Sequence, residues 1–309
     1  MHFSKITGLI AATFTPFDKE GRVATELIPR YARFLQKNQI QGVFINGTTG
    51  EGSSLTFPEK LMLMEAWAKE QTADFKVIAM LGGTSQEEAV QLGKKAQKWG
   101  LYGTAVTAPY YFRPLDVIQL SDYLAPIARA AESLPFYFYH IPLLTRVEPS
   151  MLALLEHVAG KIPNFAGIKY THHNLMEFNQ CLRYKAGRWD ALWGWDETYL
   201  AGLTMGAKGA VGSTYNFAAP LYHAIQQAFD AGRMDEALRL QEKSIDFVDL
   251  YGSFGGPAAG KAILKLSGLD CGSFRAPVAS LTPAQLHALE GKLAEQGFFD
   301  LIGSLSHRL

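Results

Sequence analysis

Lys169 is the residue of this chain whose type and setting most clearly suggest covalent chemistry. It lies near the end of Phe165–Tyr170, an otherwise apolar, β-rich run. Burial disfavours a charged ammonium, and a neutral amine is the form that attacks a carbonyl carbon to give an imine. An ion pair in which Lys169 only caps its strand is an equally good interpretation of the run by itself.

A glycine-rich segment follows an earlier apolar run. Gly47–Gly52 reads Gly-Thr-Thr-Gly-Glu-Gly and directly follows Gly42–Asn46. Small residues allow the backbone to approach a ligand closely, and successive N–H groups can bind an anion. The hydroxyls of Thr48 and Thr49 suit a carboxylate, and the segment lacks the lysine and spacing of a phosphate-binding loop. A tight turn from strand to helix is the alternative interpretation.

Tyr139 ends another run, Phe136–Tyr139, and His140 follows it; both carry groups that can move protons. Tyr139 is a candidate proton relay if a hydrogen bond holds its hydroxyl, and a half-buried packing residue otherwise. Side chains alternate along a strand, so His140 points to the opposite face. We therefore interpret His140 as structural.

Polar side chains also follow the last two runs. Asp196 and Glu197 come just after a run, and they either bind sugar hydroxyls or cap the helix that follows. Ser213 ends the eighth run, where its hydroxyl can face the same site. Each of these signals is modest alone. Together they describe a carboxylate site, a tyrosine relay and a lysine amine, which is the equipment for imine chemistry on a 2-oxo acid.

These residues require elements that bring strand ends together. Short β-rich runs alternate with longer stretches of helical periodicity, which predicts parallel strands joined by crossover helices. Eight such units closing on themselves form a (β/α)8 TIM barrel, whose active site lies at the C-terminal ends of the strands. A doubly wound open sheet usually has fewer strands, and no Gly-x-Gly-x-x-Gly turn follows the first run. The eight runs are Gly8–Phe14, Gly42–Asn46, Lys76–Gly82, Gly103–Ala108, Phe136–Tyr139, Phe165–Tyr170, Ala191–Trp193 and Gly209–Ser213.

The last third of the chain has only helical periodicity, interrupted at Gly252–Pro257 and Gly268–Pro277. Thr282 begins a capping box with proline at the first helical position. We therefore expect residues 1–220 to form the barrel core. Residues 221–309 are expected to add the last barrel helix and a C-terminal helical extension within the same structural unit.

Composition excludes several classes of protein. The 309 residues are 48% hydrophobic and 19% charged, which suits a large buried core. Lys plus Arg and Asp plus Glu both number 29, so the charge balance predicts no nucleic-acid or anionic-membrane partner. No segment approaches the roughly 20 apolar residues of a membrane span. The first residues lack the pattern of a secretory signal, so a cytoplasmic location is expected.

The number and spacing of the two cysteines predict neither a disulfide framework nor a metal site. Cys181 and Cys271 are too few for a disulfide network in a chain of this length, and neither has a second Cys or a His at ligand spacing. We interpret both as reduced, buried thiols. No metal site is expected from the sequence.

The combination of motifs resembles the dihydrodipicolinate synthase / N-acetylneuraminate lyase family of class I aldolases, from Gly8 to Asn216. The resemblance implies that Lys169 forms the imine and that Tyr139 shuttles the proton. It also implies that Thr48 and Thr49 hold a pyruvate carboxylate, with Thr48 hydrogen-bonded to Tyr139. No cofactor or metal is implied, because the imine acts as the electron sink.

A second matching segment, Pro109–Tyr110–Tyr111, concerns assembly. In the family this resemblance implies that Tyr111 reaches into a neighbouring subunit's site and takes part in catalysis there. It further implies a homotetramer built as a dimer of dimers. The near-neutral surface offers little charge repulsion against self-association.

Within the family, several positions resemble the sialic acid lyases. Leu144 stands where the synthases carry an arginine for the second substrate's carboxylate. The segments Gly194–Glu197 and Gly209–Asn216 and the residue Thr171 are similar to their lyase counterparts. The resemblance implies that the sugar is bound by Thr171, Gly194, Asp196, Glu197 and Ser213. Departures from the family pattern are Arg146, in place of a frequent glycine, and the bulky Tyr170 and Trp195.

The implied activity is reversible cleavage of N-acetylneuraminate into N-acetylmannosamine and pyruvate. The nearest alternative is a related aldolase or hydro-lyase acting on 2-keto-3-deoxy sugar acids, or on aspartate semialdehyde as dihydrodipicolinate synthase does. A non-catalytic sensor of pyruvate or sialic acid is an alternative of a different class. The sequence leaves open the preferred sialic acid and the physiological direction of the reaction.

Overall fold

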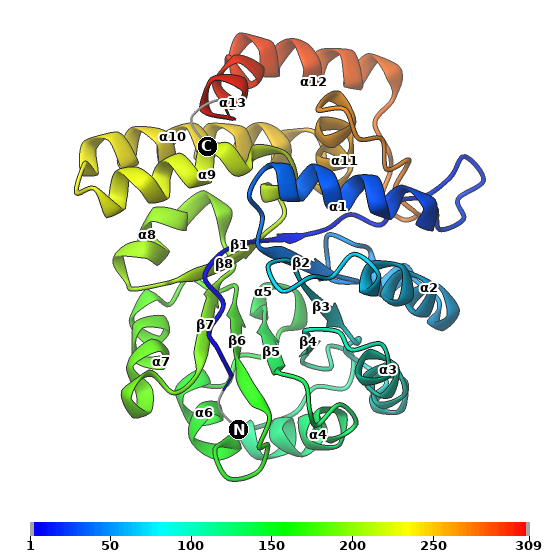
Figure 1. The fold of residues 1–309 in the computed structure, drawn as a ribbon, viewed down its shortest axis with the longest axis vertical. Coiled ribbons are helices and arrows are strands. Elements are labelled where there is room, and N and C mark those ends of the chain that lie inside the picture. Colours follow the sequence, from blue (N-terminus) through cyan, green and yellow to red (C-terminus); the bar gives the residue numbers. More distant parts are fainter. Residues whose placement is uncertain (1–2, 307–309) are drawn as a thin grey trace.

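A closed barrel of parallel strands forms the centre of the computed structural model, which describes residues 3–306 (Figure 1). Each strand pairs with the next in sequence, and β8 pairs with β1 to close the barrel. The strands are β1 Gly8–Ala12, β2 Gly42–Ile45, β3 Lys76–Met80, β4 Gly103–Thr107, β5 Phe136–His140, β6 Phe165–Tyr170, β7 Asp190–Trp193 and β8 Gly209–Gly212.

Helices surround the strands on the outside. Within residues 3–306, three short 3-10 helices lie at loops: η1 Thr25–Leu27, η2 Gly52–Ser54 and η3 Asp196–Thr198. No helix within residues 3–306 is long and apolar enough to cross a membrane. The α-helices are α1 Ile28–Lys37, α2 Phe57–Ala68, α3 Gln86–Lys98, α4 Val117–Arg129, α5 Pro142–Thr145, α6 Met151–Val158, α7 Leu175–Gly187, α8 Tyr199–Thr204, α9 Tyr215–Asp230, α10 Met234–Ser253, α11 Pro257–Leu266, α12 Pro283–Glu295 and α13 Phe298–Ser306.

The predicted (β/α)8 barrel with a C-terminal helical extension is confirmed, and every predicted run overlaps one of the strands, although β5 and β7 each extend one residue beyond their runs. Some strands are shorter than their apolar runs: β1 ends at Ala12 and not at Phe14, and β3 ends at Met80 and not at Gly82. Thr13 and Leu81, the residues directly after these strands, are buried and still donate to the carbonyls of Phe44 and Ala105 on the neighbouring strands, at 3.3 and 2.8 Å. Burial therefore extends the apolar pattern beyond the strand that it accompanies.

Two cores flank the sheet, as a barrel requires. Side chains that point inward fill the interior, among them Phe44, Ile78, Tyr139 and Val211. Side chains on the other face pack against the helices in a larger cluster that includes Ile168. The parallel register between β5 and β6 places Tyr139 opposite Lys169. The strand pairing thus decides which reactive residues become neighbours.

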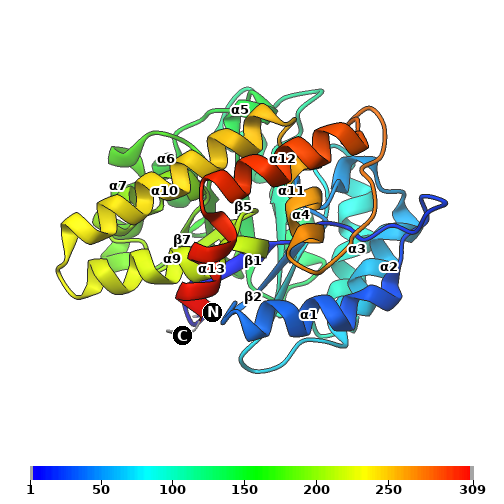
Figure 2. The same cartoon turned by 90° about the horizontal axis from the view of Figure 1, so that it is seen from above.

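The C-terminal helices pack on one side of the barrel, against α9 (Figures 1 and 2). Phe298 of α13 contacts Phe217 of α9 and Phe247 of α10 in edge-to-face geometry. The predicted capping box at Thr282 begins α12. Helix α9 already starts at Tyr215, so the expected division after residue 220 falls within this helix.

Candidate active site

Lys169 points into the barrel among aromatic rings. It lies on β6 and is 5% exposed. Its Nζ is 3.9 Å from the centroid of the Tyr139 ring and 4.6 Å from that of the Phe44 ring. None of the ion pairs formed within residues 3–306 includes Lys169. The ion pair that would make Lys169 a simple strand cap is therefore not formed there.

Tyr139 lies on β5 directly beside Lys169 and is also 5% exposed. Its ring meets Phe44 edge to face, with the centroids 5.7 Å apart. The hydroxyl of Thr107 on β4 donates a hydrogen bond to the backbone carbonyl of Tyr139 at 3.1 Å. These contacts fix both the ring and its strand, which is what a positioned proton relay needs.

Residues 47–52 form a tight turn after β2. The Glu51 N–H donates to the Thr48 carbonyl at 3.1 Å, and the Gly52 N–H donates to the Gly47 carbonyl at 3.0 Å. A Cβ on Gly52 would lie 1.9 Å from the carbonyl oxygen of Asn46, so only glycine fits there. The turn leaves Thr48 exposed and Thr49 half-buried. The strand-to-helix turn is therefore formed, with its Glu51 and Gly52 N–H groups bonded internally and the Thr48 side chain open to solvent.

A cavity of about 480 Å³ opens among the ends of β2 to β5. Its lining includes Thr48, Thr107, Tyr139 and Leu144. Thr48 and Tyr139 thus share one cavity, but the expected hydrogen bond between them is not formed in the described part of the chain. Ligand sites are concave pockets of this size, with a few polar groups on mostly apolar walls.

Asp196 follows β7 and is tied to the end of β8. Its Oδ2 accepts hydrogen bonds from the Thr214 N–H at 2.8 Å and the Thr214 hydroxyl at 2.7 Å. A Cβ on Gly212 would lie 1.8 Å from Asp196 Oδ1, so this glycine makes room for the carboxyl group. Burial raises the pKa of Asp196, against the opposing effect of the Thr214 hydrogen bonds. Asp196 therefore binds Thr214, the residue directly before α9, which is a partner the sequence did not suggest.

Glu197 is more open than its neighbour. Its side chain is half-buried, and burial raises its pKa to about 7, with a smaller contribution from the nearby Asp196 charge. A carboxyl group whose pKa is raised toward neutral by burial is typical of a functional site. Glu197 is thus the better placed of the two acids to meet a ligand.

Ser213, Thr171 and Gly194 lie around the same strand ends. Ser213 is half-buried and lies within hydrogen-bonding reach of Tyr251 from α10. The Thr171 hydroxyl donates to the Gly194 carbonyl at 3.3 Å, and a Cβ on Gly194 would lie 2.0 Å from that hydroxyl oxygen. These contacts join the ends of β6 and β7 and leave polar groups along the rim.

Tyr111 points away from the site of its own chain. It is 78% exposed on the loop between β4 and α4, and its ring meets Phe112 edge to face at 5.0 Å. Tyr110, the preceding residue, lines the cavity. Within one chain, Tyr111 is therefore separated from Lys169 and Tyr139.

His140 is buried behind the barrel wall, as strand alternation predicts. Its ring lies 5.2 Å from Tyr170 and 5.4 Å from His172, and burial lowers its pKa to about 3. His140 is consequently neutral and distant from the interior.

Arg146 adopts a left-handed conformation with φ of 55°. Glycine reaches this conformation freely, whereas other residues lose roughly 1–2 kcal/mol, which accounts for glycine, and not for the arginine found here, as the frequent residue at this position.

The sequence of this chain is similar to those of known proteins over nearly its full length. Residues 5–296 match the dihydrodipicolinate synthetase family. The chain belongs to this family. It is 36% identical to N-acetylneuraminate lyase of Rattus norvegicus over 304 residues, which cover 97% of this chain and 95% of the relative.

Solved structures of family members superpose closely. N-acetylneuraminate lyase of Proteus mirabilis has a TM-score of 0.92 at 34% identity, covering 96% of this chain and all of that chain. The sialic acid aldolase of Aliivibrio salmonicida has a TM-score of 0.93 at 34% identity, covering 96% and 98%. The family is one of class I aldolases, which act through a lysine Schiff base.

Sequence reasoning missed the residues that reach this family site from the C-terminal helices. Tyr251 on α10 approaches Ser213, and Lys261 on α11 pairs with Glu51 of the turn after β2. Neither belongs to a recognisable motif, and both lie far along the chain from their partners. Among the described residues, no group of three or more His, Cys, Asp or Glu side chains is arranged to hold a metal ion.

Proposed function

We propose that this protein is a sialic acid aldolase that reversibly cleaves N-acetylneuraminate into N-acetylmannosamine and pyruvate through an imine on Lys169. The observation that carries the proposal is the buried Lys169 amine, which lies 3.9 Å from the ring centroid of Tyr139 and has no carboxylate partner in residues 3–306. Relatives and solved structures named as N-acetylneuraminate lyases, matched over nearly the full length, support it.

Lys169 supplies the covalent step. Its neutral amine attacks the 2-oxo carbon of the open-chain sugar acid, and water leaves as the imine forms. The protonated imine accepts the electron pair of the C3–C4 bond, which breaks to give an enamine and the aldehyde of N-acetylmannosamine. Protonation of the enamine at C3 and hydrolysis of the imine then release pyruvate and the free lysine.

Tyr139 is the proton carrier in this scheme. Its oxygen takes the proton from the C4 hydroxyl as the carbon–carbon bond breaks, and returns it in the direction of synthesis. Its ring is held by Phe44, and its neighbour in register is Lys169, so both groups face the same bond. Thr48 lines the same cavity as Tyr139 and assists the proton relay. Tyr111 of a second subunit also assists the relay in this proposal.

The turn at residues 47–52 receives the carboxylate next to the 2-oxo group. Thr48 and Thr49 offer hydroxyl donors, and the N–H groups of the turn add further donors to the carboxylate oxygens. Glycine is required at position 52, because a Cβ there would lie 1.9 Å from the carbonyl oxygen of Asn46. The turn therefore binds the common part of both substrates, pyruvate and the sugar acid.

The polyol end of the sugar lies toward β7 and β8 in this proposal. Glu197 and Ser213 accept or donate hydrogen bonds to hydroxyls, and Asp196 holds the strand end that presents Ser213. Thr171 and the Gly194 carbonyl complete the rim. A site built to pair hydroxyls loses affinity steeply when one partner is removed.

The choice within the family depends on the aldehyde. Leu144 lines the cavity with an apolar side chain where the synthases use an arginine, which opposes an acceptor with a second carboxylate such as aspartate semialdehyde. Aldolases of 2-keto-3-deoxy sugar acids remain the alternative that substrate profiling separates. A sensor without catalysis requires an inert Lys169.

Borohydride trapping tests the covalent step. We expect incubation with pyruvate and borohydride to add one reduced pyruvate to Lys169, seen by mass spectrometry and peptide mapping. Lys169→Ala should lose both the adduct and all detectable lyase activity while remaining folded.

Tyr139→Phe is the matched variant for the proton step. It should still form the pyruvate adduct but lower kcat by about 10²–10⁴. A folded wild-type protein that gives no adduct, or a Lys169→Ala variant that keeps its activity, would remove the imine mechanism. An adduct without cleavage of N-acetylneuraminate would instead indicate another acceptor.

A further inference from the structure

Glu51 occupies the turn after β2 but faces away from the mouth of the barrel. Its side chain is only 4% exposed, whereas Thr48 in the same turn is exposed. Its backbone is left-handed, with φ of 58°, a conformation that residues other than glycine adopt only when their surroundings hold them. The surroundings of the Glu51 carboxylate therefore decide the shape of the turn.

Lys261 of α11 is the main partner of this carboxylate. Its Nζ lies 2.8 Å from Glu51 Oε1 and 2.9 Å from the Ser273 carbonyl, and its side chain is 3% exposed. The rings of Phe17 and Phe274 cover the ammonium, with their centroids 4.5 and 4.6 Å from Nζ. Burial lowers the pKa of Lys261, and the Glu51 charge acts in the opposite direction. Each charge is thus compensated mainly by the other.

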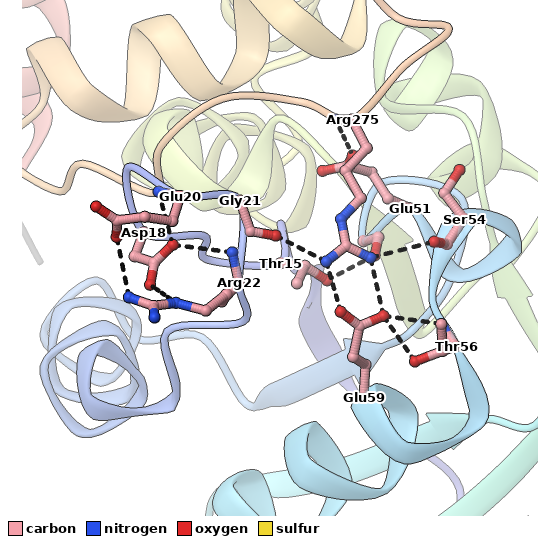
Figure 3. A network of polar contacts seen from close by, with 11 residues as sticks. Thr15, Asp18, Glu20, Gly21, Arg22, Glu51, Ser54, Thr56, Glu59 and Arg275 are labelled. Carbon is pink, nitrogen blue, oxygen red and sulfur yellow. Dashed lines mark hydrogen bonds and ion pairs between the residues drawn. The ribbon is translucent and has the colours of Figure 1, made fainter.

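The second carboxylate oxygen is also engaged. The backbone N–H of Arg275 donates to Glu51 Oε2 at 2.8 Å, and Figure 3 shows Glu51 beside this segment of the C-terminal extension. The hydroxyl of Thr15 adds a hydrogen bond to the Gly50 carbonyl at 2.6 Å. Both oxygens of Glu51 are therefore used inside the protein, so this acid serves to hold the turn and not to bind a ligand.

We propose that Glu51 and Lys261 are positioning residues for substrate carboxylates: the C-terminal extension, through Lys261, holds the turn at residues 47–52 so that Thr48 and Thr49 face the imine carbon. This inference rests on the proposed function of the turn. Glu51 stands two positions after Thr49, so a change in its backbone rotates the hydroxyls and N–H groups that precede it. A displacement of about 1 Å at such a group can cost roughly 100-fold in rate.

The test compares two lysines of the same helix. Lys261→Met removes the buried pair, and Lys265→Met removes an exposed pair with Asp270 that has no contact with the turn. We expect Lys261→Met to raise the pyruvate concentration that half-saturates imine trapping by about tenfold or more. The KM for N-acetylmannosamine should change less than about twofold, because the polyol contacts are separate. Lys265→Met should match the wild type in both.

A lone buried carboxylate can also prevent folding, so a second variant accompanies the first. Glu51→Gln/Lys261→Met removes both charges together and keeps an acceptor for the Arg275 N–H, which is expected to preserve the fold. This double variant should still need a higher pyruvate concentration to half-saturate imine trapping, with little change in the KM for N-acetylmannosamine. Circular dichroism checks folding of each protein.

Either of two results overturns the inference. One is a folded variant with unchanged half-saturation by pyruvate. The other is an equal loss for pyruvate and N-acetylmannosamine, which would indicate a general structural role. A wild-type protein that forms no adduct with pyruvate would contradict the proposed function itself, so the two failures are distinguishable.

Discussion

Lys169 and Tyr139 come from adjacent strands, and the register of β5 on β6 makes them neighbours inside the barrel. The amine lies among aromatic rings, 3.9 Å from one centroid and 4.6 Å from another. Glu197 is a different kind of group, because it is half-buried and lies beside a second acid. At the scale of single residues, the proposed site thus has two parts: a buried amine proposed for the covalent step, and a half-buried carboxyl group proposed to bind the sugar.

Glu197 should give sugar binding a dependence on pH. Burial raises its pKa to about 7, so the group is mostly protonated at pH 6 and mostly charged at pH 8. A charged carboxylate accepts stronger hydrogen bonds from hydroxyls than a neutral acid does. The KM for N-acetylmannosamine should therefore fall as the pH rises through about 7.

The control for this prediction is Glu197→Gln, which should weaken sugar binding and remove the inflection near pH 7. Steady-state kinetics from pH 6 to 8 measures both, and pyruvate saturation should not follow the same curve. An inflection that persists in Glu197→Gln would assign it to another group.

The segment between α11 and α12 acts as a clamp on two loops of the barrel. The Arg275 guanidinium donates to Glu59 at the start of α2, to the Ser54 carbonyl and to the Gly21 carbonyl (Figure 3). Glu59 also accepts from Thr56 in the capping box of α2. At the scale of elements, one arginine therefore joins the β1–α1 loop, η2 and α2 to the C-terminal extension.

This clamp predicts a loss of stability in acid. The Arg275 hydrogen bond holds the pKa of Glu59 down at about 2, below its ordinary 4.5, and the pair is largely shielded from solvent. A depressed carboxyl pKa stabilises the fold fully above pH 4.5, and the contribution disappears as the pH falls from 4.5 toward 2. A shift from 4.5 to about 2 corresponds to at most roughly 3.4 kcal/mol, and screening by solvent reduces the contribution of this partly exposed pair.

Glu59→Gln should make the thermal unfolding midpoint less dependent on pH over this range, and it should lower the midpoint at pH 7. Glu20→Gln is the matched control, since its pair with Arg22 is exposed and contributes little. Thermal melts from pH 2.5 to 7 compare the three proteins. Parallel curves for Glu59→Gln and the wild type would show that the clamp carries no such energy.

Exposed apolar side chains gather beside Tyr111 on one part of the surface. Phe112 is 86% exposed, Leu115 88% exposed and Ile118 more than half exposed. Such a group on a folded chain typically marks a protein–protein contact. At the scale of the whole molecule, we propose a homotetramer, a dimer of dimers, in which this patch meets its copy and Tyr111 enters the partner's site.

Light scattering tests this assembly. The wild type should have about four times the 34.0 kDa mass of one chain. Phe112→Glu should lower the mass and also reduce kcat by roughly tenfold or more, because the site loses the partner's tyrosine. Met176→Glu, on α7 and 70% exposed, is the control that should change neither. A fully active monomeric wild type would refute the shared site.

Local patterns in the sequence were sufficient for the architecture. Each apolar run overlapped one strand, because a strand buried on both faces must be apolar over most of its length. Lys169, Tyr139 and the turn at residues 47–52 were identifiable because reactive or small residues stand out at the ends of such runs. The strand order then brings all strand ends to one mouth, which follows from the barrel itself.

Tertiary structure alone decided which groups hold these residues in place. Asp196 binds Thr214 directly before α9, and Glu51 pairs with Lys261 across 210 positions of sequence. Nothing in the periodicity around Lys261 or Tyr251 differs from an ordinary amphipathic helix, because periodicity reports only the face that a helix buries and not its partner. The sequence by itself therefore determined the barrel and its candidate chemical groups. Their orientation depends on long-range contacts with the C-terminal helices, which no local pattern encodes.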